Sequence, residues 1–363
     1  MAMDDPFRVM VVDDSAVIRG LFTRFLEADP AISVVASVSD GQSALDSLDR
    51  YDVEIIVLDI EMPVMDGMTA LPRLLEKKPG VQILMASTLT RKNAEVSLRA
   101  LSMGAADYVT KPSSTSEIHS VDTFKAELIN KIRAIAEAGR GERRRVAKPA
   151  PTDPAAPKAL DIVLRDPPIQ EPDVIAIGSS TGGPQALFRL FGDLGGQVRL
   201  PILITQHMPA TFTSLLADHI SRASTAPCTE AKDGEAILPG RVYLAPGDYH
   251  MIAERNGHGK AIRLTKSEPE NYCRPAVDPM LRSLAALYGP KILVIMLTGM
   301  GSDGRKGCEA VVEIGGSIIA QDQESSVVWG MPGTVVTAGL CCAVLPLSEI
   351  APYVRKLVVR SAA

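Results

Sequence analysis

The feature that most constrains the fold is a strand that ends abruptly in a glycine- and serine-rich turn and continues as a helix, at residues 174–187. The turn, residues 178–182, matches the Gly-x-Ser-x-Gly pattern of a nucleophile elbow, in which a tight bend exposes the central serine, here Ser180. Similar turns also cradle phosphates or dinucleotides at helix N-termini, or serve only as structural connections. The pattern therefore predicts an α/β unit in which Ser180 is a nucleophile or part of a binding or structural turn.

The length and composition of the chain predict two α/β domains. Its 363 residues exceed one typical domain, and a content of 46% hydrophobic and 4% aromatic residues suits sheets packed between helices. The formal net charge of -5 gives no electrostatic case for a nucleic-acid partner. A basic and then proline- and alanine-rich run, 139–158, cannot bury enough apolar surface to fold alone. We therefore predict one domain at 1–136, a flexible linker at 137–171 and a second domain at 172–363.

Cysteine spacing and apolar content indicate a cytoplasmic protein. The five cysteines have no metal-ligand spacing, and the N-terminus lacks the apolar core of a signal peptide. No stretch of the sequence is long and apolar enough to span a bilayer. We therefore expect a reduced, cytoplasmic environment and no direct membrane insertion.

Two strand-like runs of the first domain end in carboxylates. The run 7–12 leads directly into Asp13 and Asp14, and a second buried run, 54–60, delivers Asp59. Parallel strands bring their carboxyl ends to one edge of a sheet, so the three side chains are expected to converge. Like charges at close range need a cation. A hard, oxygen-liganded ion such as Mg²⁺ fits them, and one carboxylate is a candidate phosphoryl acceptor.

Two further runs bring a hydroxyl and an ammonium group to the same edge. The run 81–86 ends at Ser87 and Thr88, either of which offers a hydroxyl, and the run 106–110 ends at Lys111. Together with the carboxylates, these groups complete a predicted phosphate site.

Residues 7–136 resemble a response-regulator receiver domain, through these strand-end residues, the run EMPVMDGM after Asp59 and the pair Gly104-Ala105. The resemblance implies a doubly wound, flavodoxin-like fold that a histidine kinase phosphorylates with the help of Mg²⁺. In the family's pattern, Asp13 and Asp14 are the acidic pair that binds the metal, and Asp59 is the phosphorylated aspartate, which also binds the metal. The hydroxyl residue is Ser87, the aromatic switch is Tyr108, and the lysine is Lys111.

The second domain alternates strand-like and helical runs. Six apolar runs are typical of strands, and helical patterns separate several of them, as at 212–223 and 278–289. This alternation predicts a doubly wound, mostly parallel α/β sheet with helices on both faces and chemistry beyond the carboxyl ends of its strands. Ser180, His207 and Asp303 stand at three of those ends.

Serine, histidine and aspartate together can make an alcohol nucleophilic. The imidazole takes the proton of the serine, and the carboxylate holds the imidazole in the right tautomer. Asp248 and Asp278 compete with Asp303 for the acidic role, and Asp278 is also a candidate N-cap for a helix beginning at Pro279. The order serine, histidine, acid differs from the serine, acid, histidine order of common α/β-hydrolases, which disfavours a generic lipase or esterase.

The motifs GSSTGGP, ITQHMP and LTGMGSDG resemble the catalytic domain of the chemotaxis protein-glutamate methylesterases, the CheB family. The resemblance implies that Ser180 is the nucleophile, His207 the base and Asp303 the acid, with the backbone N–H of Met300 in the oxyanion site. It also implies that the chain demethylates glutamate γ-methyl esters on methyl-accepting chemotaxis receptors and deamidates glutamines, with no cofactor for hydrolysis. The unphosphorylated receiver is then expected to cover the active site, and phosphorylation of Asp59 to uncover it.

The sequence leaves two other functions open. In one, the chain is a phosphorylation-dependent interaction module with little turnover. In the other, it is a methylesterase of a signalling pathway other than swimming behaviour. The complete set of Ser180, His207 and Asp303 favours an enzyme over an interaction module.

Overall fold

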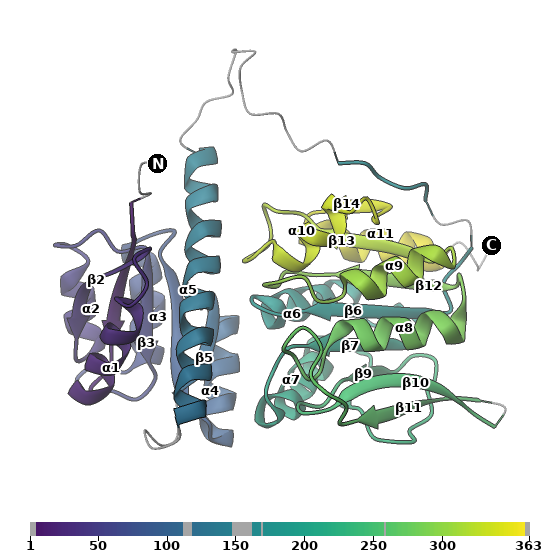
Figure 1. Ribbon diagram of the computed structural model, residues 1–363, viewed down its shortest axis with the longest axis horizontal. Coiled ribbons are helices and arrows are strands. Elements are labelled where there is room, and N and C mark those ends of the chain that lie inside the picture. The colour runs from purple at the N-terminus through teal and green to yellow at the C-terminus, as the bar shows by residue number, and fades with distance from the viewer. Residues whose placement is uncertain (1–4, 112–117, 147–161, 168–169, 258, 360–363) are drawn as a thin grey trace, which may run out of the picture. The chain divides into compact units, whose positions relative to one another are not determined.

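The structure is a computed structural model that describes residues 5–111, 118–146, 162–167, 170–257 and 259–359. The chain divides into two compact units, Met1–Pro154 and Ala155–Ala363, each with its own central sheet (Figure 1). The division falls inside the segment predicted as a linker, of which residues 147–161 and 168–169 lie outside the described residues.

Five parallel strands form the sheet of the first unit, in the order β2-β1-β3-β4-β5. This is the flavodoxin-like order, and it confirms the predicted doubly wound fold. The chain adds β2 on one side of β1 and then β3, β4 and β5 on the other side. The crevice beyond the carboxyl ends of β1 and β3 is therefore the expected place for a site. The elements are β1 (Phe7–Val12), α1 (Ala16–Leu26), β2 (Ile32–Val38), α2 (Gly41–Ser47), β3 (Ile55–Asp59), α3 (Gly67–Lys77), β4 (Gln82–Thr88), α4 (Arg91–Ser102), β5 (Asp107–Lys111) and α5 (Ile118–Val146).

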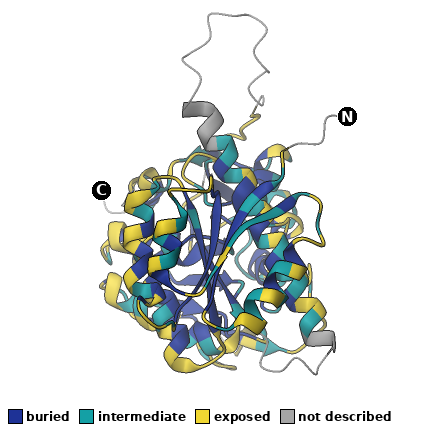
Figure 2. Cartoon of the chain, turned by 90° about the vertical axis from the view of Figure 1, so that its left-hand side faces the viewer, coloured by how far each residue is buried: buried dark blue, intermediate teal, exposed yellow. Residues whose placement is uncertain are grey.

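Burial and capping explain why these segments form these elements. Every residue of β3 is buried, as expected for a parallel strand covered by helices on both faces. Figure 2 shows this pattern, with dark blue strands inside and yellow, exposed helix surfaces outside. At the start of each of the first four helices a side chain accepts a hydrogen bond from the first turn, which fixes where strand-to-helix loops end. These caps are Ser15, Asp40, Asp66 and Thr90.

The last helix of the first unit continues past the predicted domain end at residue 136. α5 runs to Val146, and the guanidinium of Arg140 donates hydrogen bonds from Nε and Nη2 to the carboxylate of Glu54, each 2.7 Å long. Burial of Glu54 raises the pKa of its carboxyl. The hydrogen bonds and positive charges of Arg140 and Arg8 have the larger effect, so the pKa is lowered overall. Arg140 belongs to the segment predicted as a flexible linker, residues 137–171. Its pairing with a buried carboxylate instead ties this part of α5 to the domain.

The sheet of the second unit has seven parallel strands in the order β14-β13-β12-β6-β7-β9-β8, with a separate antiparallel pair, β10-β11. The elements are β6 (Val174–Ser179), α6 (Gly183–Leu194), β7 (Ile202–Gln206), α7 (Ala210–Ala223), β8 (Cys228–Glu230), β9 (Val242–Leu244), β10 (His250–Asn256), β11 (Gly259–Thr265), α8 (Val277–Tyr288), β12 (Ile292–Met296), α9 (Arg305–Glu313), β13 (Ser317–Gln321), α10 (Gly330–Thr337), β14 (Ala343–Leu345) and α11 (Leu347–Val359). The predicted parallel α/β class is confirmed for this unit as well.

Helices cover both faces of this sheet. One layer consists of α6, α7 and α11, and the other of α8, α9 and α10, with the β10-β11 pair packed on α8 (Figure 1). The chain order reverses at β6, which lies between β7 and β12. The crevice at the carboxyl ends of these three strands is therefore the switch point of the fold. Among the described residues, no helix combines the length and apolar character that crossing a bilayer requires.

Candidate active site and phosphoacceptor site

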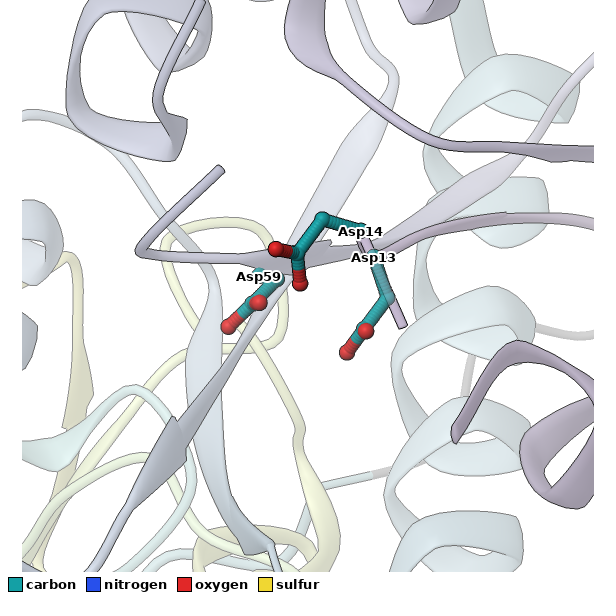
Figure 3. Close-up of side chains that lie close together, drawn as sticks. All are labelled: Asp13, Asp14 and Asp59. Carbon is teal, nitrogen blue, oxygen red and sulfur yellow. The ribbon is translucent and has the colours of Figure 1, made fainter. Parts of the chain in front are cut away.

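The first unit gathers three carboxylates at the carboxyl ends of β1 and β3. One carboxylate oxygen from each of Asp13, Asp14 and Asp59 lies within 4.8 Å of the others (Figure 3). Lys111 Nζ, at the end of β5, lies 2.6 Å from Asp13 Oδ2 and 2.7 Å from Asp59 Oδ1. Asp13 and Asp59 are buried and Asp14 is exposed. The structure thus brings the four predicted residues together.

The charges of this cluster favour a divalent cation. Burial raises the pKa of Asp59, and the neighbouring charge of Asp13 raises it further, although Lys111 acts in the opposite direction. One lysine cannot balance three carboxylates, and all three offer the oxygen ligands that Mg²⁺ prefers. The residues therefore fit the Mg²⁺ that phosphorylation of a receiver domain requires in general.

The predicted switch residues lie on the two neighbouring strands. Ser87 is buried at the end of β4, with its Oγ 3.1 Å from Oγ of Ser97, whereas the hydroxyl of Thr88 accepts a hydrogen bond of 2.7 Å from Asn93 Nδ2. Tyr108 is buried, and burial raises the pKa of its phenol well above 10.0. Both hydroxyls are therefore held by a side chain of α4, Ser87 in the interior and Thr88 at the surface.

In the second unit, the elbow forms at the end of β6. The backbone N–H of Ser180 donates to Thr298 O at 3.0 Å, and its carbonyl accepts from Gly183 N at 2.7 Å, where α6 begins. Gly182 has φ of 75°, a left-handed conformation that favours glycine. A Cβ on Gly299 would stand 2.9 Å from Cβ of Ser180, so only glycine lets the β12 loop approach the serine so closely.

Burial separates the two adjacent serines. Ser179 is fully buried, and its hydroxyl donates a hydrogen bond of 2.6 Å to Gln206 Oε1. The amide nitrogen of Gln206 in turn donates to the carbonyl of Ser180 at 2.9 Å. Ser179 is thus part of the support of the elbow, whereas Ser180 is only half-buried.

The structure joins His207 to Asp303 beside this elbow. His207 Nε2 lies 2.7 Å from Asp303 Oδ2. The same carboxylate oxygen accepts a hydrogen bond of 2.6 Å from the backbone N–H of Val277. Burial raises the pKa of Asp303. The hydrogen bond and charge of His207 and the backbone donors at the start of α8 have the larger effect, so the pKa is lowered overall. Asp303 therefore remains a carboxylate that orients the imidazole.

Cys273 is a contact of the imidazole that the sequence did not predict. Its Sγ lies 3.5 Å from His207 Nδ1, the ring atom that faces away from Asp303. Burial lowers the pKa of His207, but the hydrogen bonds of Asp303 and Cys273 outweigh burial and raise it to about 10. These contacts favour the protonated ring, which must lose a proton before it can act as a base.

Neither competing aspartate contacts the imidazole. Asp248 is exposed and in a left-handed conformation with φ of 66°. The expectation that Asp278 caps a helix beginning at Pro279 is wrong, because α8 begins at Val277 and its N-cap is Ala276. The carboxylate of Asp278 instead accepts from Gly307 N at 2.6 Å, in the first turn of α9, and so stabilises the neighbouring helix.

The backbone N–H groups of Thr181 and Met300, near Ser180, are among those that have no acceptor within the described residues. The N–H of the residue that follows an elbow nucleophile is a typical oxyanion donor, and Met300 follows the glycine that packs on Ser180. Across the described residues, no hydrogen bond joins the Ser180 hydroxyl to His207. Such contacts often tighten only when substrate is bound.

Sequence reasoning missed three polar residues that support the site, namely Gln206, Asn271 and Cys273. The amide of Asn271 donates to Asp303 Oδ1 at 2.8 Å and to Asp278 Oδ2 at 2.9 Å, so it holds both acids in place. The only signal for Gln206 was its position directly before His207, at the end of a strand. Asn271 and Cys273 lie in a loop far from the other motifs, and no spacing rule pointed to them.

The comparisons with known proteins match both units. A family model described as CheB methylesterase matches residues 175–354, and one described as response regulator receiver domain matches residues 9–121. A protein of Rhodospirillum centenum named protein-glutamate methylesterase/protein-glutamine glutaminase of group 2 operon is 58% identical, with 99% of this chain and 96% of that protein covered. A protein of Azospirillum brasilense named protein-glutamate methylesterase/protein-glutamine glutaminase is 57% identical, with coverages of 99% and 94%.

A solved structure matches the second unit. The crystal structure of the Thermotoga maritima CheB methylesterase catalytic domain is 41% identical and superimposes with a TM-score of 0.51. The match covers 52% of this chain and 100% of that domain.

Proposed function

This chain belongs to the CheB methylesterase family, and from that membership and the site geometry we propose that it acts on chemoreceptors through Ser180, His207 and Asp303. It is a protein-glutamate methylesterase and protein-glutamine glutaminase, controlled by its receiver domain. The observation that carries the proposed site is the His207–Asp303 pair beside a serine elbow, where the N–H groups of Thr181 and Met300 have no acceptor in the described part of the chain.

The proposed reaction follows the logic of a serine hydrolase. His207 Nδ1, once deprotonated, takes the proton of Ser180, whose oxygen attacks the carbonyl carbon of the glutamate γ-methyl ester. The negative oxygen that forms is stabilised by the N–H groups of Thr181 and Met300, a contribution of roughly 3 to 4 kcal/mol per donor in a related serine enzyme. The imidazolium then protonates the leaving methoxide, which departs as methanol and leaves an acyl-enzyme.

Water completes the cycle. His207 takes a proton from a water molecule, the resulting hydroxide attacks the acyl carbon, and Ser180 leaves with the proton that the imidazole returns. The product is a free glutamate carboxylate. With a glutamine substrate the same steps release ammonia in place of methanol. The direct test is methanol release from methylated receptor membranes, measured with and without a small-molecule phosphodonor.

Regulation is proposed to begin at Asp59, phosphorylated by a histidine kinase in the cytoplasm. Phosphorylation replaces the single negative charge of the Asp59 carboxylate with the roughly one and a half to two negative charges of an acyl phosphate, beside Lys111 and Ser87. Asp13 and Asp14 would bind the Mg²⁺ that neutralises the donor and the acceptor carboxylate, which makes phosphorylation possible despite like charges. An interaction module without turnover is a weaker alternative, because it would not need an imidazole paired with a buried acid.

Phosphorylation should raise methanol release by at least about tenfold, and only with Mg²⁺ present, if the receiver acts as a two-state cover. The Asp59→Asn variant should stay at the low basal rate under the same conditions. A fragment of residues 162–363, which keeps the Arg165 N–H bond to Cys341 O, should be active without a phosphodonor. A fragment no faster than the unphosphorylated full chain would contradict simple occlusion and indicate direct activation instead.

The pH dependence of turnover should report the imidazole. Because the active form of His207 is neutral and its pKa is raised, kcat/KM should increase with pH through the neutral range. Removing the thiol in Cys273→Ala deletes one contact that raises this pKa, so the rise should begin at lower pH and neutral-pH activity should increase roughly two- to tenfold. The measurement is methanol release from phosphorylated enzyme across pH.

Cys273→Ser is the matched variant for that experiment, since it keeps a polar group beside Nδ1. An unchanged profile in Cys273→Ala would contradict the assignment of the thiol contact as a determinant of the pKa of His207. A complete loss of activity in Cys273→Ala, with an active Ser180→Ala, would make the enzyme a cysteine hydrolase.

A further inference from the structure

A two-residue turn presents an aromatic side chain next to the active site. Glu270 and Cys273 exchange backbone hydrogen bonds of 3.1 and 2.9 Å, and the two residues between them, Asn271 and Tyr272, have φ of 53° and 62°. This is the geometry of a tight turn that favours Asn and Gly at its centre. Among the large apolar and aromatic side chains of the described residues, that of Tyr272 is the most exposed, with a relative exposure of 104%.

The turn is held rigidly against the catalytic residues. Arg282 on α8 binds both carboxylate oxygens of Glu270 at 2.7 Å. Asn271 donates to Asp303 Oδ1 at 2.8 Å, and Cys273 Sγ lies 3.5 Å from His207 Nδ1. Both chain neighbours of Tyr272 therefore contact the His207–Asp303 pair, and the ring projects from the rim of the active site.

Nothing within the described part of the second unit explains a tyrosine at this position. The side chain has no hydrogen bond there, and a left-handed conformation is unfavourable for a residue with a bulky Cβ substituent. Glycine or asparagine would suit the backbone better. An exposed aromatic ring on a rigid base is, however, the typical anchor of a protein contact, because it offers a large contact area and loses little conformational entropy.

The reaction requires such an anchor. A methyl ester on one glutamate offers little surface, so binding energy for a protein substrate must come from contacts away from the reacting carbon. We propose that Tyr272 is a substrate-docking residue, whose ring lies against the receptor segment that carries the methylated glutamate, and this inference rests on the proposed function. Tyr272 would thus position the receptor without contacting the reacting atoms.

The test compares a large and a small substrate on the full-length, phosphorylated protein. Tyr272→Asn removes the ring but suits the left-handed backbone, and Tyr272→Phe keeps the ring. We expect Tyr272→Asn to raise KM for methylated receptor membranes about tenfold, with kcat and the hydrolysis of p-nitrophenyl acetate within about twofold of the parent. Tyr272→Phe should resemble the parent, and the melting temperature of Tyr272→Asn should be equal or higher.

Leu238→Ala is the matched control, because Leu238 is a second exposed large side chain of the same unit, 47% exposed, in the loop between β8 and β9. An unchanged receptor KM in Tyr272→Asn, or equal losses with both substrates, would overturn the docking role. Faster hydrolysis of the small ester by unphosphorylated Tyr272→Asn would also overturn it, since the ring would then contact the receiver of its own chain. If the parent released no methanol from receptors while hydrolysing the small ester, the proposed function itself would fail.

Discussion

Ser180→Ala should reduce methanol release from methylated receptors by roughly 10⁴- to 10⁶-fold, because a nucleophile and its base fail as a unit. Phosphorylation of Asp59 should be unaffected, since the two sites belong to separate units. The readout is methanol release from phosphorylated enzyme, with phosphorylation measured in parallel. Residual activity above the uncatalysed rate is expected from the oxyanion donors alone.

Ser179→Ala is the matched control for this prediction. It removes the 2.6 Å hydrogen bond to Gln206 Oε1 and leaves that buried oxygen unpaired, so we expect a loss of about 1 to 3 kcal/mol of stability. Activity below the melting transition should persist. An inactive Ser179→Ala together with an active Ser180→Ala would mean that the register of the elbow is wrong.

The places of the candidate site residues in the fold could be predicted largely because parallel strands deliver polar residues to one edge. Asp13 and Asp59 each follow an apolar run, and so do Ser180 and His207, which made both sheets and the strand-end positions readable from local pattern. The confirmed fold class rests on the same alternation. Resemblance to known motifs then supplied the roles that local pattern left open.

What could not be predicted depends on contacts between distant segments. The turn that carries Asn271 and Cys273 reaches the active site only because the Glu270–Arg282 pair and α8 place it there. The part of α5 beyond residue 136 is held to the domain through Arg140 by a buried partner, Glu54, in the loop before β3. Neither contact can be recognised from residue spacing in the sequence, because the residues that make it are ordinary for a loop or a solvated helix.

Asp303→Asn should lower kcat by about 10⁴-fold, because an amide cannot stabilise the imidazolium and favours the wrong tautomer of His207. The structure adds a cost in stability. The carboxylate accepts from the backbone N–H groups of Val277, Asp278 and Gly304, and an amide NH₂ would face at least one of these donors. We therefore expect an additional loss of about 1 to 3 kcal/mol in the free energy of unfolding. Methanol release and thermal unfolding of the same preparation measure the two effects.

Asp278→Asn separates the chemical effect of Asp303→Asn from its effect on stability. Asp278 shares the Asn271 contact and accepts from Gly307 N at 2.6 Å, but it does not touch His207. Its amide variant should therefore lose a similar amount of stability while keeping kcat within about tenfold of the parent at a temperature where both are folded. Burial raises the pKa of Asp278, whereas the pKa of Asp303 is lowered. Replacing the carboxylate of Asp278 by a neutral amide should therefore cost somewhat less than the same change at Asp303. Equal loss of kcat in the two variants at equal folded fraction would show that the acid acts through the packing of α8 and α9 and not through the tautomer of His207.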